Sequence, residues 1–174
     1  MVVAKNDIAH QSLSEQIQTR TLSRTYNAFI WGLPFPERGI IEGYIQRNKN
    51  NRLKMELTEN SGKYSKTNYS VLENYSSLVS LVECKLDTGR THQIRVHFSN
   101  NGHPLIGDIL YGGYGRKLPN YIDEETKLYV DKFPRQALHS KRISFFHPVT
   151  KKKLEFDVPL SNDMDKLLKL LRKI

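Results

Sequence analysis

The chain has 174 residues, enough for one domain with a hydrophobic core, and 27 Lys and Arg against 18 Asp and Glu give it a formal charge of +9. This excess favours a polyanionic partner such as a nucleic acid, although solubility alone would also account for it. A single cysteine, Cys84, excludes an internal disulfide and a cysteine metal cluster. With no apolar run of membrane-spanning length and no signal-peptide pattern, a cytoplasmic protein without a membrane segment is expected.

The first residues, Met1-Val2-Val3-Ala4, form an apolar run that predicts a short strand. Because chain termini are usually polar, this start predicts either an edge strand or a chain that begins partway through a fold. Asp7 then predicts the N-cap of a helix that runs to about Gln18. Its apolar stripe consists of Ala9, Leu13 and Ile17.

Apolar and β-branched residues predict four strands in the first half of the chain. The strands are Thr25–Trp31, Gly39–Ile45, Lys66–Tyr75 and Leu78–Leu86. The last two are expected to form a hairpin that turns at residues 74–77. The basic, asparagine-rich stretch 46–54 predicts an exposed hairpin end.

A strand-turn-helix is predicted around Lys85-Leu86-Asp87-Thr88-Gly89-Arg90-Thr91-His92-Gln93-Ile94-Arg95-Val96-His97. Thr88-Gly89 turns the chain, and apolar residues from Thr91 onward recur at helical spacing. Arg95 shares a helix face with Thr91, so packing should hold it in place. The polar side chains crowded at this corner predict the functional site. Spacing alone leaves open whether Arg95 binds a ligand or bridges to a neighbouring carboxylate for stability.

The remainder predicts a loop or short helix over residues 115–135, paired strands at Ala137–Phe146 and Leu154–Val158, and a final helix. Ser161 is expected to cap that helix. Its buried stripe consists of Met164, Leu167, Leu168 and Leu171. We therefore expect one α+β domain over residues 1–174, with mainly antiparallel strands and flanking helices.

Several kinds of chemistry find no support in the motifs. His92 and His97 lie five residues apart on different helix faces, so a metal site is not expected. No Gly-x-Ser-x-Gly elbow occurs, and the glycine cluster at residues 111–115 lacks the lysine of a phosphate-binding loop. A basic surface with aromatic strand residues and a positioned arginine suits a protein that grips a nucleic acid and holds one base or one carboxylate.

From Leu86 to His97 the sequence closely resembles the RluA-type RNA pseudouridine synthases that act on large-subunit ribosomal RNA. Other stretches agree in order and spacing. They are Arg24-Thr25-Tyr26-Asn27-Ala28, Gly102-His103-Pro104-Leu105-Ile106-Gly107-Asp108, Tyr111-Gly112, Arg135-Gln136-Ala137-Leu138-His139 and His147-Pro148. The resemblance covers essentially the whole chain and implies part of the pseudouridine synthase catalytic fold.

The resemblance implies that uridine in RNA is isomerised to pseudouridine without a cofactor or a metal. It puts the active-site tyrosine at Tyr26, which would stack on the flipped uracil and help remove the C5 proton. It puts the active-site arginine at Arg95, which would pair with a catalytic aspartate and contact the nucleotide's phosphate. The residues expected to contact RNA are Arg90, His92, Gln93, Lys151 and Lys152.

The sequence departs from the family in one respect, because the His-Arg-Leu-Asp motif that bears the catalytic aspartate is absent and the sequence begins just past its place. We therefore expect the carboxy-terminal portion of a synthase, without an S4-like domain and inactive alone. The alternatives are a non-catalytic RNA-binding remnant and one half of a split enzyme. An exposed sheet edge near residues 1–4 is expected to bind a complementary amino-terminal fragment or to cause self-association.

Overall fold

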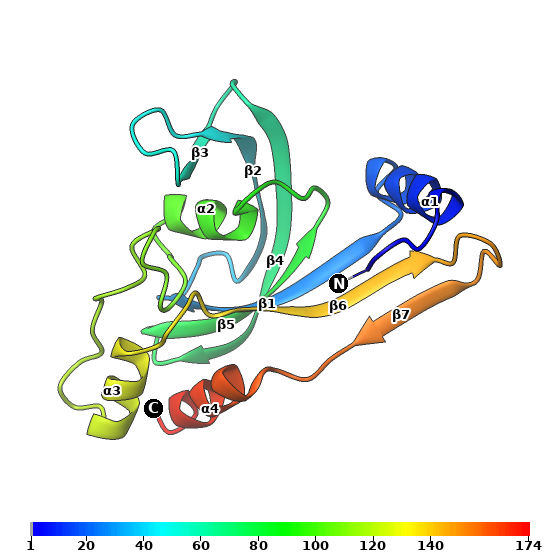
Figure 1. Cartoon of the computed structure of the whole chain (residues 1–174). Coiled ribbons are helices and arrows are strands. Elements are labelled where there is room, and N and C mark those ends of the chain that lie inside the picture. The colour runs from blue at the N-terminus through cyan, green and yellow to red at the C-terminus, as the bar shows by residue number, and fades with distance from the viewer. Residues whose placement is uncertain (1) are drawn as a thin grey trace.

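A seven-stranded sheet forms the centre of the molecule, in the order β3-β2-β4-β5-β1-β6-β7 (Figure 1). The structure, a computed structural model, describes residues 2–174. The strands are β1 Ser23–Trp31, β2 Arg38–Arg47, β3 Met55–Thr58, β4 Lys63–Tyr75, β5 Val79–Leu86, β6 Leu138–Phe146 and β7 Lys153–Asp157. Every neighbouring pair is antiparallel. The helices are α1 Asp7–Gln18, α2 Gln93–Asn100, α3 Glu124–Asp131 and α4 Asn162–Leu171. This arrangement confirms the predicted α+β class.

Strand β1 lies inside the sheet, and its alternating side chains enter two separate hydrophobic clusters. Phe29 and Trp31 belong to a cluster that α3 and α4 cover, whereas Ala28 and Ile30 belong to a cluster with residues of α2. Helix α2 therefore lies on the opposite face of the sheet from α3 and α4. Because both faces of β1 are buried, the middle of this strand is apolar without interruption.

Helix α4 buries the stripe Met164, Leu167, Leu170 and Leu171. The predicted Leu168 is only partly buried and Leu170 takes its place. Ser161 is the N-cap residue by position, but its side chain makes no capping hydrogen bond to the helix.

The helix predicted to run to about Gln18 is confirmed as α1, but the predicted strand before it and the predicted cap were wrong. Val2 to Ala4 do not form a strand, and Met1 lies outside the described residues. Helix α1 is capped by Asn6 instead of Asp7, with the Ala9 amide donating to its side chain at 2.9 Å. The edges of the sheet are β3, a strand that the sequence pattern missed, and β7.

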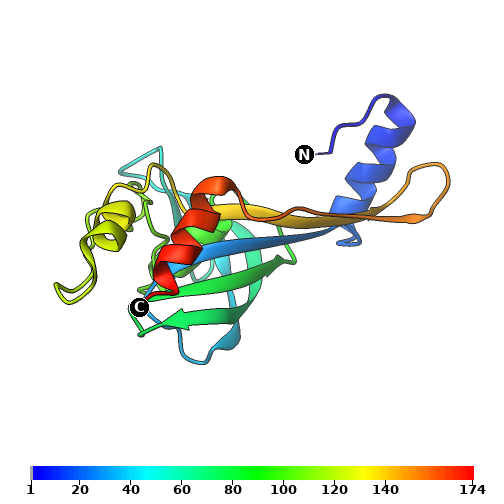
Figure 2. The same ribbon diagram turned by 90° about the horizontal axis from the view of Figure 1, so that it is seen from below.

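Helix α1 contacts the sheet through a single polar side chain. The Gln16 amide donates to the Phe146 carbonyl at 2.8 Å and accepts from the Phe146 amide at 2.7 Å. Gln16 is also the one buried residue of the helix, while Ile17 of the predicted apolar stripe is 52% exposed. Helix α1 and the β6–β7 hairpin thus project together from one end of the molecule (Figures 1 and 2).

Candidate active site

The turn between β5 and α2 is held by the side chain of Gln93, which is 2% exposed. Its oxygen accepts from the Thr88 hydroxyl at 2.8 Å and from the Arg90 amide at 2.9 Å. Its nitrogen donates to the Lys66 carbonyl and the Thr67 hydroxyl of β4, both at 3.0 Å. All four hydrogen-bonding positions of the amide are therefore occupied. In this geometry Gln93 positions the turn, while its expected contact with RNA stays a prediction.

Arg95 projects from α2 and forms a bidentate ion pair with Asp108. The Arg95 Nε and Nη2 atoms lie 2.7 and 2.8 Å from the two carboxylate oxygens. The Asp108 side chain is fully buried and that of Arg95 is 13% exposed. The amides of Leu110 and Tyr111 also donate to Asp108 Oδ1, each at 3.1 Å. Within residues 2–174 the partner of Arg95 is thus a neighbouring carboxylate, the alternative that spacing left open. The expected pairing of Arg95 with a catalytic aspartate stays a prediction, because the sequence contains no His-Arg-Leu-Asp motif.

Tyr111 links Arg95 to His92. The Arg95 guanidinium lies 4.8 Å from the centre of the Tyr111 ring. The Tyr111 hydroxyl accepts from the Met55 amide at 2.8 Å and lies 2.9 Å from His92 Nδ1. Burial raises the pKa of Tyr111, whereas burial and then the Arg95 charge lower the pKa of His92. If His92 is neutral, its Nδ1 accepts a hydrogen bond from the Tyr111 hydroxyl, and this arrangement satisfies both groups.

Tyr26 lies on β1, paired with Cys84 of β5 and Ser140 of β6. The register of the β1–β6 pair shifts between Thr25 and Tyr26, an irregularity of the kind that redirects a side chain. The half-buried Tyr26 packs against the cluster that contains Ile94, the residue before Arg95. The two expected catalytic residues are therefore brought to the same face of the sheet.

Arg24, two residues before Tyr26, contacts the turn from the same face. A Cβ atom added to Gly89 would lie 2.4 Å from an Arg24 terminal nitrogen, so the guanidinium of Arg24 packs directly against this glycine. The neighbouring Arg90 is half-buried, and its Nε donates to the Tyr64 carbonyl at 2.9 Å. The sequence pattern indicates only that Arg24 lies in the strand of Tyr26, and it does not predict this contact with the turn.

Two of the expected RNA contacts lie elsewhere. Lys151 and Lys152 are in the turn of the β6–β7 hairpin, at the end of the molecule where α1 projects and away from α2 (Figures 1 and 2). The structure thus brings Arg90 and His92 together with Tyr26 and Arg95, but it does not bring the two lysines to that corner.

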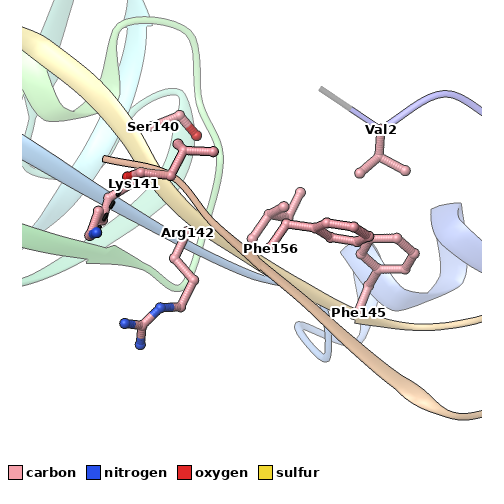
Figure 3. A pocket seen from close by; sticks show the side chains of 8 residues that line it. Val2, Ser140, Lys141, Arg142, Phe145 and Phe156 are labelled. Carbon is pink, nitrogen blue, oxygen red and sulfur yellow. Dashed lines mark hydrogen bonds between the residues drawn. The ribbon is translucent and has the colours of Figure 1, made fainter. Parts of the chain in front are cut away.

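A hollow with a volume of about 420 Å³ lies against β6 and β7 (Figure 3). The Phe145 and Phe156 rings stack within it, with centroids 6.0 Å apart, and Val2 points toward them. Phe156 is 54% exposed. The sequence pattern did not reveal this surface, because the alternation of β6 and β7 does not show whether a second layer covers their apolar face.

Among residues 2–174, no group of three or more His, Cys, Asp or Glu residues could hold a metal ion. None of the helices described for this chain is both long enough and apolar enough to cross a membrane.

Comparisons with known proteins identify the family. The model of the family described as RNA pseudouridylate synthase matches residues 1–100. An uncharacterized RNA pseudouridine synthase of Bacillus subtilis is 42% identical over 173 residues, which are 99% of this chain and 52% of that protein. The ribosomal large subunit pseudouridine synthase D of Neisseria meningitidis serogroup B is 43% identical, over 99% of this chain and 45% of its own length.

Solved structures agree with this result. The human RNA pseudouridylate synthase domain containing 4 superposes with a TM-score of 0.73 at 25% identity, over 97% of this chain and 69% of that one. The human RNA pseudouridylate synthase domain containing 1 gives a TM-score of 0.68 at 28% identity, over 99% of this chain and 74% of that one. The chain spans about half the length of the curated relatives that it matches. It belongs to the RNA pseudouridylate synthase family.

Proposed function

We propose that the chain forms the Tyr26 and Arg95 part of an RNA pseudouridine synthase that acts on uridine in large-subunit ribosomal RNA. The proposal rests on one observation in a chain of this family. Tyr26 packs on the same face of the sheet, and against the same hydrophobic cluster, as α2. Ribosomal RNA is the favoured substrate because relatives of about 40% identity are named for it. A cytoplasmic location accords with that substrate.

The geometry suggests a division of roles between the two residues. Tyr26 is half-buried on β1, so its ring can stack on a flipped uracil and its hydroxyl can take part in removing the C5 proton. Asp108 occupies Nε and Nη2 of Arg95 and leaves Nη1 for a phosphate or for a further carboxylate. Uridine and pseudouridine are isomers, so breaking the N1 bond and forming the C5 bond balances without an oxidant or a co-substrate.

The catalytic aspartate that the resemblance implies is not supplied by the 174 residues, which contain no His-Arg-Leu-Asp motif. We infer that isomerisation requires a further polypeptide segment that carries it. The hollow at β6 and β7, with its partly exposed Phe156, is the surface that we assign to that segment.

A chimera tests the proposal. The 174-residue chain replaces the matching half of the Neisseria meningitidis synthase, and pseudouridine in unmodified ribosomal RNA is measured by tritium release. We expect no product from the 174 residues alone and product from the chimera. In the chimera, Tyr26→Phe should lower the rate by about 100-fold or more, because it removes the proton-transferring group. The matched control is Tyr114→Phe, an exposed tyrosine whose loss should leave the rate unchanged.

Two outcomes would contradict the proposal. Pseudouridine made by the 174 residues alone would show that they need no further aspartate. A chimera as active with Tyr26→Phe and with Arg95→Ala as without them would remove both residues from the reaction.

A further inference from the structure

A groove with a volume of about 410 Å³ lies between the ends of β2 and β4 and the turn that precedes α2. Arg47 and Lys63 line one side, and Gly89, Arg90 and Thr91 line the other. The residues that line the groove include no acidic and no aromatic side chain. The groove is therefore positively charged and offers no aromatic ring on which a base could stack.

The charges in the groove are not neutralised by the protein. Over residues 2–174, no carboxylate lies within 4 Å of the charged nitrogens of Arg47, Lys63 or Arg90. Arg47 donates to the Arg52 carbonyl and Arg90 to the Tyr64 carbonyl. These bonds hold the two guanidinium groups in position and leave their charges uncompensated.

The acidic residue of β3, Glu56, forms no ion pair with these cations in the part of the chain that the structure describes. The two Glu56 oxygens accept from the side-chain amides of Gln46 and Asn48 at 2.9 and 2.5 Å. The positive potential also reaches His92, since the Arg47 charge contributes to lowering the pKa of that residue after burial and the Arg95 charge. Geometry and electrostatics thus agree that the groove attracts anions.

The groove continues toward the candidate active site through Arg24. The guanidinium of Arg24 lies against Gly89, and its Nε is buried without a hydrogen-bond partner in the part of the chain that the structure describes. Arg24 stands two residues from Tyr26 on the same strand face. A row of three arginines, Arg24, Arg90 and Arg47, therefore leads from Tyr26 into the groove.

We propose that this groove binds the phosphate backbone of the RNA strand that adjoins the target uridine, with Arg47, Lys63 and Arg90 each contacting a phosphate. Two arginines and a lysine suit phosphate oxygens, because each can donate charge-assisted hydrogen bonds to them. Without aromatic side chains the groove positions the strand and does not read its bases. The inference rests on the proposed function because it takes RNA as the substrate.

The test measures RNA binding by the 174-residue chain with fluorescence anisotropy of a labelled single-stranded RNA 20-mer at increasing KCl. The groove variants are Arg47→Gln, Lys63→Gln and Arg90→Gln. The matched controls are Lys132→Gln, at the end of α3, and Lys117→Gln, in the segment before α3. Like the groove cations, neither lysine has a carboxylate within 4 Å among residues 2–174. Every variant removes one positive charge.

Each groove variant should weaken binding about fivefold at low salt and reduce the slope of log K against log salt by about 0.7. The triple variant should reduce the slope by about 2, which is the sum expected for three lost contacts to a single strand. The controls should change affinity by less than about twofold, because they lie away from the groove.

A second measurement uses the unmodified chain and does not depend on how the variants fold. Lysine acetylation by an N-hydroxysuccinimide ester is followed by mass spectrometry with and without the RNA. Bound RNA should protect Lys63 and leave Lys132 reactive. Equal reactivity of Lys63 with and without bound RNA overturns the proposal.

The outcomes separate this inference from the proposed function. If the chain binds RNA but the groove variants behave like the controls, the groove is not the binding site and the proposed function stands. If the chain binds no RNA at low salt, the groove proposal fails, while the pseudouridine assay on the chimera decides the function independently.

Discussion

His97 is a buried histidine whose protonation state follows from its neighbours. The Ser65 hydroxyl donates to the Gly43 carbonyl at 2.8 Å, so its oxygen must accept from His97 Nε2, also at 2.8 Å. His97 Nδ1 has no hydrogen-bond partner among residues 2–174. Burial lowers the pKa of His97 from 6.5 to about 4, so the neutral ring is the one that fits.

The lowered pKa of His97 predicts that the folded chain loses stability as the pH falls. Between pH 6.5 and 4 the unfolded chain protonates His97 while the folded chain does not, so the free energy of unfolding falls as the pH falls. From pH 7 to 4.5 the loss due to His97 should be about 2 kcal/mol. The His97→Gln variant keeps a hydrogen-bond donor to Ser65 but has no titrating group at this position. Between pH 7 and 4.5 its free energy of unfolding should therefore fall by about 2 kcal/mol less than that of the unmodified chain. Urea unfolding at both pH values measures the difference, and equal losses in the two proteins would contradict the assignment.

At the scale of elements, the ion pair of Arg95 and Asp108 joins α2 to the loop that follows it. Asp108 accepts the guanidinium and two loop amides, so it fixes helix and loop together. Breaking a buried pair leaves an uncompensated charge and typically costs about 3 to 5 kcal/mol. We expect Asp108→Asn to lower the free energy of unfolding by about this amount in urea denaturation at pH 7.

The control for this prediction is a surface pair. Lys169 and Asp165 are 2.7 Å apart, with side chains 72% and 45% exposed, so Asp165→Asn should change stability little. If Asp108→Asn were as mild as the control, Asp108 would not hold Arg95 in the folded protein.

The elements that the sequence predicted well are those with a strong local pattern. Strands β1 and β5 have apolar runs, and α4 has a clear amphipathic stripe. Strand β3 was missed because its four residues are half-buried and depend on pairing with β2. The apolar start of the chain was misassigned because a strand needs a partner strand, which Val2 to Ala4 do not have here.

The local structure of the candidate site was predicted, but the contacts of its side chains were not. The turn and α2 follow from local spacing, whereas the roles of their side chains depend on distant segments. Gln93 binds residues 26 and 27 positions earlier on β4, and Arg95 binds Asp108 13 positions later. These separations along the sequence do not correspond to neighbouring positions on one helix or strand, so the sequence pattern alone could not identify the partners.

At the scale of the whole molecule, the main sheet is covered on both faces but one end is not. Helices α3 and α4 cover one cluster and α2 covers the other. Helix α1 and the β6–β7 hairpin extend beyond these layers (Figures 1 and 2). At that end Ile17, Phe156 and Val158 are 52%, 54% and 45% exposed. Exposed apolar residues grouped in this way favour association with another polypeptide surface.

We therefore expect the 174-residue chain on its own to self-associate through the hollow at β6 and β7 as its concentration rises. The charged residues of edge strand β7, among them Lys153 and Glu155, disfavour strand addition, so the apolar face and not the edge should form the contact. Phe156→Lys places a charge in that face and should shift the chain to a monomer in light scattering. Phe35→Lys changes a 95% exposed phenylalanine in the β1–β2 loop and should leave association unchanged. A monomer at all concentrations, or a response to Phe35→Lys alone, would show that this hollow does not drive the association.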